Sequence, residues 1–216
     1  MFQTVSIVAL LITFIGIAVH WALTPMGPRH GLVRGGVHVA SLLLIEQKSS
    51  LLGALKKLCY LVAMLCFVVL AITGFWPVLI RGEHISGWLM MIHATFAPIF
   101  AICLAILALT WAGGHRFVAE DCPWVQRLLR RVTNLRVADD DRPWRCSLVV
   151  YKLAFWLLMF LALPLILSIL ISMFHLLGTE WQHLTLALHR WSSLAFVIVA
   201  ILYTYLAIRL RTAQEA

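Results

Sequence analysis

The run SGWLMMIHATFAPIFAICLAILALTWA, residues 86–112, decides the fold class because it contains no Asp, Glu, Lys or Arg. As a helix rising about 1.5 Å per residue, it is long enough to cross a hydrocarbon core of roughly 30 Å. Four more apolar runs of similar kind occupy 2–23, 58–80, 148–177 and 185–209. Backbone groups in lipid must bond within their own segment. The sequence therefore predicts an all-α integral membrane protein with five transmembrane helices.

Composition supports the same class. Of the 216 residues, 62% are hydrophobic and only 12% are charged, against roughly 25% charged in soluble domains. The net charge of +8 comes without any nucleic-acid motif, so it indicates basic cytoplasmic loops rather than a nucleic-acid partner. No CxxC motif occurs, which argues against a c-type haem or a CxxC metal site. The cysteines inside apolar runs, Cys59, Cys66 and Cys103, are expected to be packing residues.

The distribution of Lys and Arg predicts the orientation. The loop 24–57 holds five of them and the loop 113–147 holds seven, and two more begin the C-terminal tail. The opposite side has only two, Arg81 and Arg190. By the positive-inside rule, the N-terminus lies outside and the C-terminus in the cytoplasm of a bacterial inner membrane. Basic amphipathic stretches in both long loops are expected to lie on the inner surface, against lipid headgroups or a partner subunit.

Two histidines lie within the predicted spans. His93 is about two turns into the run 86–112, and His189 is about one turn into the run 185–209. Both runs begin at the outer face, so the two imidazoles are expected at similar depth. Two neutral imidazoles on separate helices are what bis-histidine ligation of a haem requires. The alternative is that both histidines form hydrogen bonds between helices, but an ionisable residue within the membrane indicates function by default.

The neighbours of these histidines favour haem. Ala97 lies one turn beyond His93, and Ser192 one turn beyond His189, which leaves room for a flat macrocycle. Arg81 and Arg190, the outer cations, are expected to pair with haem propionates.

The other histidines divide by side. Three lie at the outer membrane edge: His84, His175 and His183. The alternatives for these three are simple solvation, a place in a quinone site, or ligation of a second haem. Four lie at the inner side and are expected to be interfacial: His20, His30, His38 and His115.

Two stretches carry a resemblance to a family. LKKLCYLVAMLCFVVLAITGFW, residues 55–76, is similar to an opening helix with a basic residue, a His-Trp pair and a later Thr-Gly-Phe. LHRWSSLAFVIVAILYTYLAI, residues 188–208, is similar to a last helix with an outer His, a second His 14 residues on and then a Tyr. Together they resemble the four-helix cytochrome b subunit of bacterial respiratory formate dehydrogenases and nickel–iron hydrogenases, and related bacterial b-type cytochromes. The likeness covers residues 58–216 and leaves 1–57 as an extra transmembrane helix with a basic cytoplasmic loop.

The departures from the family concern its inner haem. That family binds two haems, one near each face. The outer ligands carry over to His93 and His189, with His84 as the alternative for the former. The inner ligands are replaced by Cys59 or Tyr60 and by Tyr203. The resemblance therefore implies one haem b, held in a four-helix bundle near the outer face.

The function that follows is electron transfer within a respiratory oxidoreductase complex. The chain has no carboxylate pair, nucleophile triad or phosphate loop within its spans, so we expect no catalysis by this chain alone. Its partners would be membrane lipid, menaquinone or ubiquinone, and a periplasmic redox subunit such as a multihaem cytochrome c or an iron–sulfur protein. The alternative is a membrane anchor without redox function. The expected cofactor site comprises the two ligands, the two outer arginines and two outer-edge histidines: His93, His189, Arg81, Arg190, His84 and His183.

Overall fold

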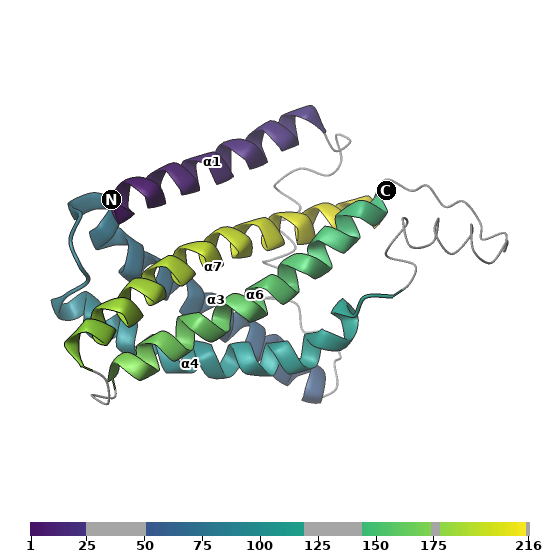
Figure 1. The fold of residues 1–216 in the computed structure, drawn as a ribbon. Helices are drawn as coiled ribbons and strands as arrows, with labels where there is room; N and C mark the ends of the chain where they lie inside the picture. Colours follow the sequence, from purple (N-terminus) through teal and green to yellow (C-terminus); the bar gives the residue numbers. More distant parts are fainter. Residues whose placement is uncertain (25–50, 119–143, 174–177, 215–216) are drawn as a thin grey trace, which may run out of the picture. The chain divides into compact units, whose positions relative to one another are not determined.

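The computed structural model describes residues 1–24, 51–118, 144–173 and 178–214, and within these ranges it is helical and has no strand (Figure 1). Five of the described helices are long and apolar enough to cross a membrane, which confirms the predicted number and the all-α class. The predicted surface segments between residues 25–50 and 119–143, and His30, His38 and His175, lie outside the described residues.

The five helices are α1 (Phe2–Leu23), α3 (Leu51–Trp76), α4 (Gly87–Trp111), α6 (Trp144–Met173) and α7 (Thr179–Gln214). Helix α1 has the predicted bounds, and α4 differs by one residue at each end. Helices α3 and α7 extend beyond their apolar runs, since Leu, Ala, Lys and Arg in the flanks are good helix formers. At about 1.5 Å per residue, α7 is roughly 54 Å long and exceeds a hydrocarbon core.

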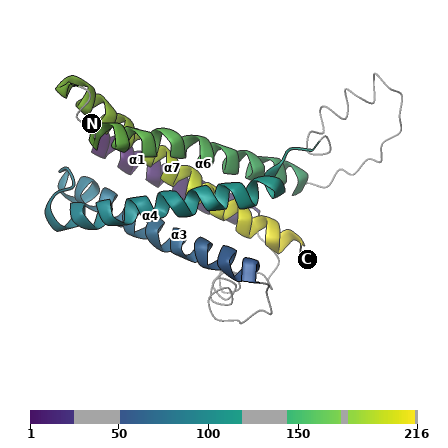
Figure 2. The same ribbon diagram turned by 90° about the horizontal axis from the view of Figure 1, so that it is seen from below.

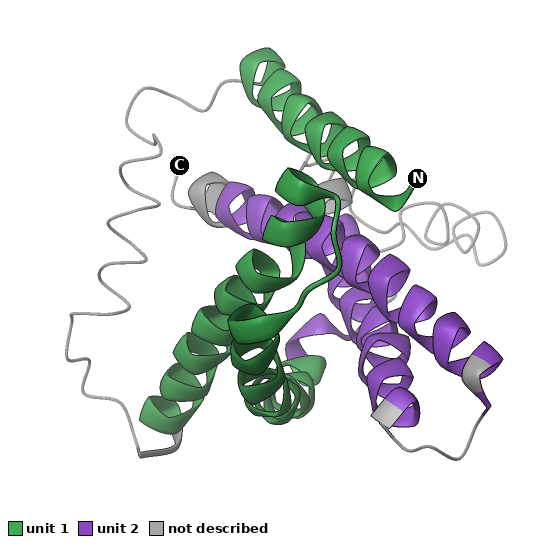
Figure 3. Cartoon of the chain, turned by 90° about the vertical axis from the view of Figure 1, so that its left-hand side faces the viewer, with its two compact units in different colours: residues 1–113 green, residues 114–216 purple. Residues whose placement is uncertain are grey.

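The chain forms two compact units, Met1–Gly113 and Gly114–Ala216, coloured separately in Figure 3. In the first unit α3 packs along α4, and in the second α6 packs along α7 (Figure 2). The predicted boundary at residues 57 and 58 rests on the family likeness and stays a prediction.

Helix α3 ends in a π-helical turn, η1 (Pro77–Arg81). Pro77 has no N–H to continue the α-helical pattern, and Gly82, with φ of 70°, stops the turn in the left-handed conformation. The start of α1 lies against this turn, where the Gln3 side-chain amide donates to the Leu79 carbonyl oxygen at 3.2 Å. A side chain at Gly82 would collide with Gln3, because a Cβ there would lie 2.9 Å from its Oε1. Glycine at this position thus permits both the turn and the contact with α1.

Two aromatic pairs link α3 and α4. Tyr60 packs on Trp111 with ring centroids 5.4 Å apart, and the rings of Phe67 and Phe100 lie 6.2 Å apart. Small buried residues lie on the same stretches of the two helices: Cys59, Ala63, Cys66 and Cys103. The two helices are therefore antiparallel and closely packed, as small side chains at a membrane helix interface allow.

Candidate functional site

His93 is held by α3. Its Nδ1 lies 2.9 Å from the Thr73 hydroxyl oxygen, and the ring is partly buried. The next residue, Gly74, completes the contact: a Cβ there would lie 3.3 Å from Cε1 of the imidazole, closer than most real contacts. The Thr73–Gly74 pair thus accommodates the ring, with the hydroxyl fixing one edge and the missing side chain making room for it.

The hydroxyl of Thr73 has one proton, and the Val69 carbonyl oxygen, which can only accept, lies 2.8 Å away. In the tautomer in which His93 carries its proton on Nδ1, the imidazole donates to Thr73 while Thr73 donates to Val69. In a neutral ring, Nε2 then carries the lone pair that a metal ligand uses.

His189 is held in the same way in the second unit. Its Nδ1 lies 2.9 Å from the Leu165 carbonyl oxygen of α6. A carbonyl oxygen accepts only, so the imidazole donates from Nδ1, and the neutral ring again carries its lone pair on Nε2. Buried hydroxyls surround this contact, since Ser168 also donates to the Leu165 carbonyl and Ser192 donates to the Leu188 carbonyl one residue before His189.

His189 has the kind of support that metal-ligating imidazoles usually have, and His93 has a threonine hydroxyl in the corresponding place. Ligating histidines almost always donate their second ring N–H to a carbonyl, a carboxylate or water, which orients the ring and raises its basicity. A bis-histidine haem site uses two protein ligands. Among the described residues, no group of three or more His, Cys, Asp or Glu side chains could hold a metal ion.

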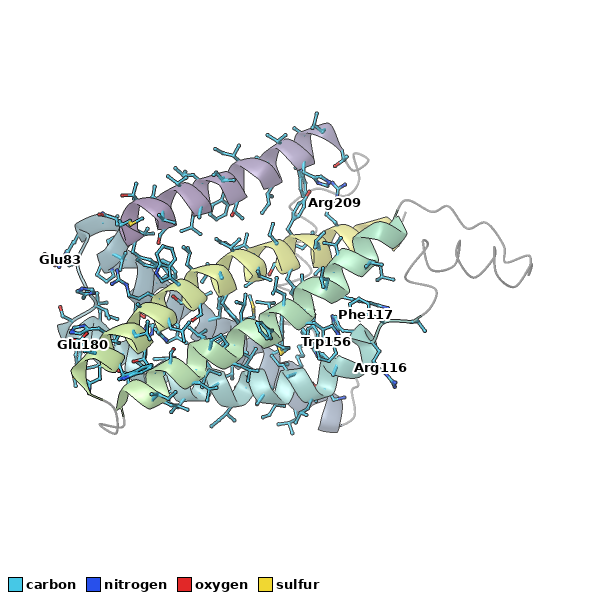
Figure 4. All side chains as sticks on the ribbon, viewed as in Figure 1. Glu83, Arg116, Phe117, Trp156, Glu180 and Arg209 are labelled. Carbon is cyan, nitrogen blue, oxygen red and sulfur yellow. The ribbon has the colours of Figure 1, made fainter. Side chains whose placement is uncertain are left out.

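Three of the other predicted site residues lie near helix ends. Arg81 ends η1 and is exposed, and His84 lies in the exposed link between η1 and α4. His183 is exposed in the first turns of α7, near the end that Glu180 marks in Figure 4. Arg190 lies inside α7, partly buried beside His189. The roles of these four residues stay predictions.

His115 differs from the expectation of an interfacial side chain. It is 7% exposed, and its ring stacks on Phe155 with centroids 4.0 Å apart. Its Nε2 lies 3.1 Å from the Tyr203 hydroxyl, which lies 2.8 Å from the Tyr151 hydroxyl. The two tyrosine rings are stacked at 4.7 Å. A hydrogen-bonded group of one buried histidine and two partly buried tyrosines therefore joins the start of the second unit to α6 and α7.

Two backbone carbonyls next to this group are also bonded to α6. The Trp156 indole N–H donates to the His115 carbonyl oxygen at 2.9 Å, and the Lys152 ammonium donates to the Arg116 carbonyl oxygen at 3.0 Å. Figure 4 shows Trp156, Arg116 and Phe117 close together at this end of the unit. Lys152 is only 6% exposed, and the Arg116 carbonyl oxygen accepts a hydrogen bond from its buried ammonium group.

The residues that the resemblance sets against the family's inner haem ligands are Cys59 or Tyr60, and Tyr203. Tyr203 bonds to His115 and Tyr151 within the second unit. Cys59 donates its thiol to the Cys103 carbonyl oxygen, 3.6 Å away, and Tyr60 packs on Trp111 within the first unit. The expectation of a single haem stays a prediction.

No protein-family model, curated protein or solved structure matches this chain. The likeness to cytochrome b subunits accordingly rests on the residues quoted above.

Proposed function

We propose that this chain is the cytochrome b subunit of a respiratory complex in a bacterial inner membrane. It exchanges electrons between the quinone pool and a periplasmic redox partner, and it holds one b-type haem near the outer face. In this proposal His93 and His189 would hold the haem iron. When bound, the haem supplies a one-electron iron couple.

The observation that carries the proposal is the matched support of the two imidazoles. Nδ1 of His93 lies 2.9 Å from the Thr73 hydroxyl, and His189 donates from Nδ1 to the Leu165 carbonyl. Two partly buried histidines in separate apolar helices, each with Nδ1 held by a neighbouring helix, fit the donor set of a bis-histidine haem. Interhelical hydrogen bonding without haem is the competing explanation of both contacts, and the spectrum described below separates the two.

The remaining residues of the proposed site bind and orient. Gly74 leaves the His93 ring its place, and Thr73 and the Leu165 carbonyl hold the two rings in orientation. Arg81 and Arg190 supply positive charge for propionates. The exposed His84 and His183 remain the next candidates for a ligand or for a quinone contact.

A haem-free membrane anchor is the alternative. Cys59 and Tyr203 at the family's inner ligand positions favour it, because a chain that has lost one haem has a simple route to losing both.

The deciding experiment is a reduced-minus-oxidised spectrum of the purified protein, with pyridine haemochrome quantitation of haem per chain. We expect one b-type haem and a low-spin bis-histidine electron paramagnetic resonance signal. His93→Ala and His189→Ala should each abolish the low-spin signal. The control is His20→Ala, which replaces an exposed histidine near the C-terminal end of α1 and should leave the signal intact. Absence of haem from an intact complex supports the anchor. If the low-spin signal survives both span variants but is lost in His84→Ala or His183→Ala, the ligand assignment is wrong.

A further inference from the structure

The chain that follows α4 is fixed to α6 by two side chains one turn apart. The Lys152 ammonium donates to the Arg116 carbonyl oxygen at 3.0 Å, and the Trp156 indole N–H donates to the His115 carbonyl oxygen at 2.9 Å. The His115 ring itself is buried in the same unit. The backbone of residues 115 and 116 therefore has a defined place beside α6.

This fixed backbone presents an arginine at the depth of the lipid headgroups. Arg116 is the first residue beyond the apolar span Gly87–His115, and its side chain is exposed (Figure 4). Trp156 is 40% exposed beside it, and tryptophan is enriched at the boundary between hydrocarbon and water. A guanidinium at this depth is able to bind a phosphate group through two parallel hydrogen bonds.

No carboxylate lies near these cations among the described residues of the second unit. The one carboxylate there, Glu180, is in the first turn of α7. Tyr203, which contacts His115, lies roughly 35 Å of helix farther along. Lys152 is buried, so its charge acts through a medium of lower dielectric constant than water. This end of the second unit therefore attracts anions.

An exposed apolar strip on α6 begins beside the two cations. Its members are each more than half exposed: Leu153, Phe160, Leu163 and Leu167. With Trp156 they recur at intervals of three and four residues, which places them on one face of the helix. The strip covers about 21 Å of helix, whereas one leaflet of hydrocarbon is roughly 15 Å thick. Positive charge at headgroup depth above such a strip matches the form of an anionic phospholipid.

We propose that this end of the second unit binds one anionic phospholipid, such as phosphatidylglycerol. The Arg116 guanidinium holds the headgroup phosphodiester, the charge of Lys152 adds to the attraction, and an acyl chain lies along the strip on α6. The expected orientation places this site in the cytoplasmic leaflet. The site needs no haem, so it is independent of the proposed function.

A partner subunit is the other occupant that would cover this surface. It would have to bring a carboxylate or a phosphate to the depth of Arg116 and an apolar helix to the strip. An anionic lipid has a phosphodiester at that depth and acyl chains beneath it as part of its own structure, so charge and hydrophobicity together favour lipid.

The test measures lipid binding to the full chain in dodecylmaltoside by native mass spectrometry. The protein is titrated with dioleoylphosphatidylglycerol, or with dioleoylphosphatidylcholine, which has the same acyl chains and no net charge. Arg116→Gln removes the proposed phosphate ligand. Arg209→Gln, near the C-terminal end of α7, is the matched control because it removes the same charge from another helix. Circular dichroism checks that both variants keep their helix content.

We expect the first phosphatidylglycerol to bind at least about fivefold more tightly than phosphatidylcholine, since each Lys or Arg near the membrane surface contributes roughly that factor. Arg116→Gln should weaken phosphatidylglycerol binding by about fivefold and leave phosphatidylcholine binding unchanged, and Arg209→Gln should change either by less than about twofold. Equal binding of the two lipids to the unaltered chain overturns the proposal and leaves the surface to a partner subunit. Equal losses in the two variants also overturn it, because the attraction would then be that of the whole basic surface. So does release of the lipid by millimolar glycerol 3-phosphate, which would assign the site to a soluble phosphate.

Discussion

Thr73→Val tests whether the hydroxyl that contacts His93 stabilises the α3–α4 pair. Valine keeps the branched shape of threonine but removes the acceptor for the imidazole Nδ1–H, which lies 2.9 Å away. Hydrogen bonds between membrane helices contribute on average about 0.6 and at most about 1.7 kcal/mol. Leaving a partly buried N–H without this acceptor adds to that loss, so we expect Thr73→Val to lower the free energy of unfolding by about 1–2 kcal/mol. A loss of about 1.4 kcal/mol is a tenfold change in the unfolding equilibrium.

The matched control is Thr95→Val. Thr95 is exposed on α4, and its hydroxyl donates to the Met91 carbonyl oxygen one turn earlier, as Thr73 does to Val69. Such bonds within a helix add little stability, so the control should change the unfolding free energy by less than about 0.5 kcal/mol. Unfolding is followed by tryptophan fluorescence in mixed dodecylmaltoside and dodecyl sulfate micelles. Equal effects of the two variants, or an unchanged effect of Thr73→Val in a His93→Ala background, would refute the reasoning.

Two further substitutions test the supports of the candidate sites. Tyr203→Phe removes a hydroxyl that bonds to two partners, and we expect it to lower the free energy of unfolding by about 1–3 kcal/mol. Tyr151→Phe removes only one of those bonds and should lower it by about 0.5–1.5 kcal/mol. The reverse order would contradict the bridging role of Tyr203. Gly74→Ala places a Cβ 3.3 Å from the His93 ring, so we expect weaker haem retention and shifted low-spin g values. Gly16→Ala has nothing within 4 Å of the new Cβ and should leave both unchanged, with helix stability raised by up to about 1 kcal/mol.

The five spans were predictable because each run buries its own backbone bonds and needs no partner to be recognised. Their ends were less predictable. Hydropathy marks where apolar residues stop, and α7 continues to Gln214 through polar residues that favour helix. The π-helical turn at Pro77–Arg81 is followed by Gly82 and is contacted by Gln3, which is far away in sequence.

The candidate ligands were predictable from their position in apolar runs, but their supports were not. The Thr73–His93 contact joins residues 20 positions apart and depends on the register between α3 and α4. His115 was expected at the interface because it lies between an apolar run and a basic loop. Its burial is decided by Phe155 and by Tyr203, which is 88 positions away, and no local pattern encodes such a partner.

If the protein holds a single haem near one face, we expect its electron transfer to depend little on the membrane potential. The family's two haems pass electrons across the membrane, and each charge moved across it changes in energy by about 2.3 kcal/mol per 100 mV. The resemblance sets Cys59 or Tyr60, and Tyr203, against that family's inner ligands, and Cys59 and Tyr203 bond to neighbours in their own unit. Without an inner haem, quinone exchange is expected at the outer side, so electrons would cross little of the membrane field. The rate of quinone exchange in sealed vesicles should therefore change by less than about twofold when a potassium diffusion potential of about 100 mV is imposed. Electron transfer across the full membrane would instead shift the equilibrium by nearly 50-fold. A strong dependence on potential would mean that electrons reach the inner face by a second cofactor, and the one-haem proposal would fail.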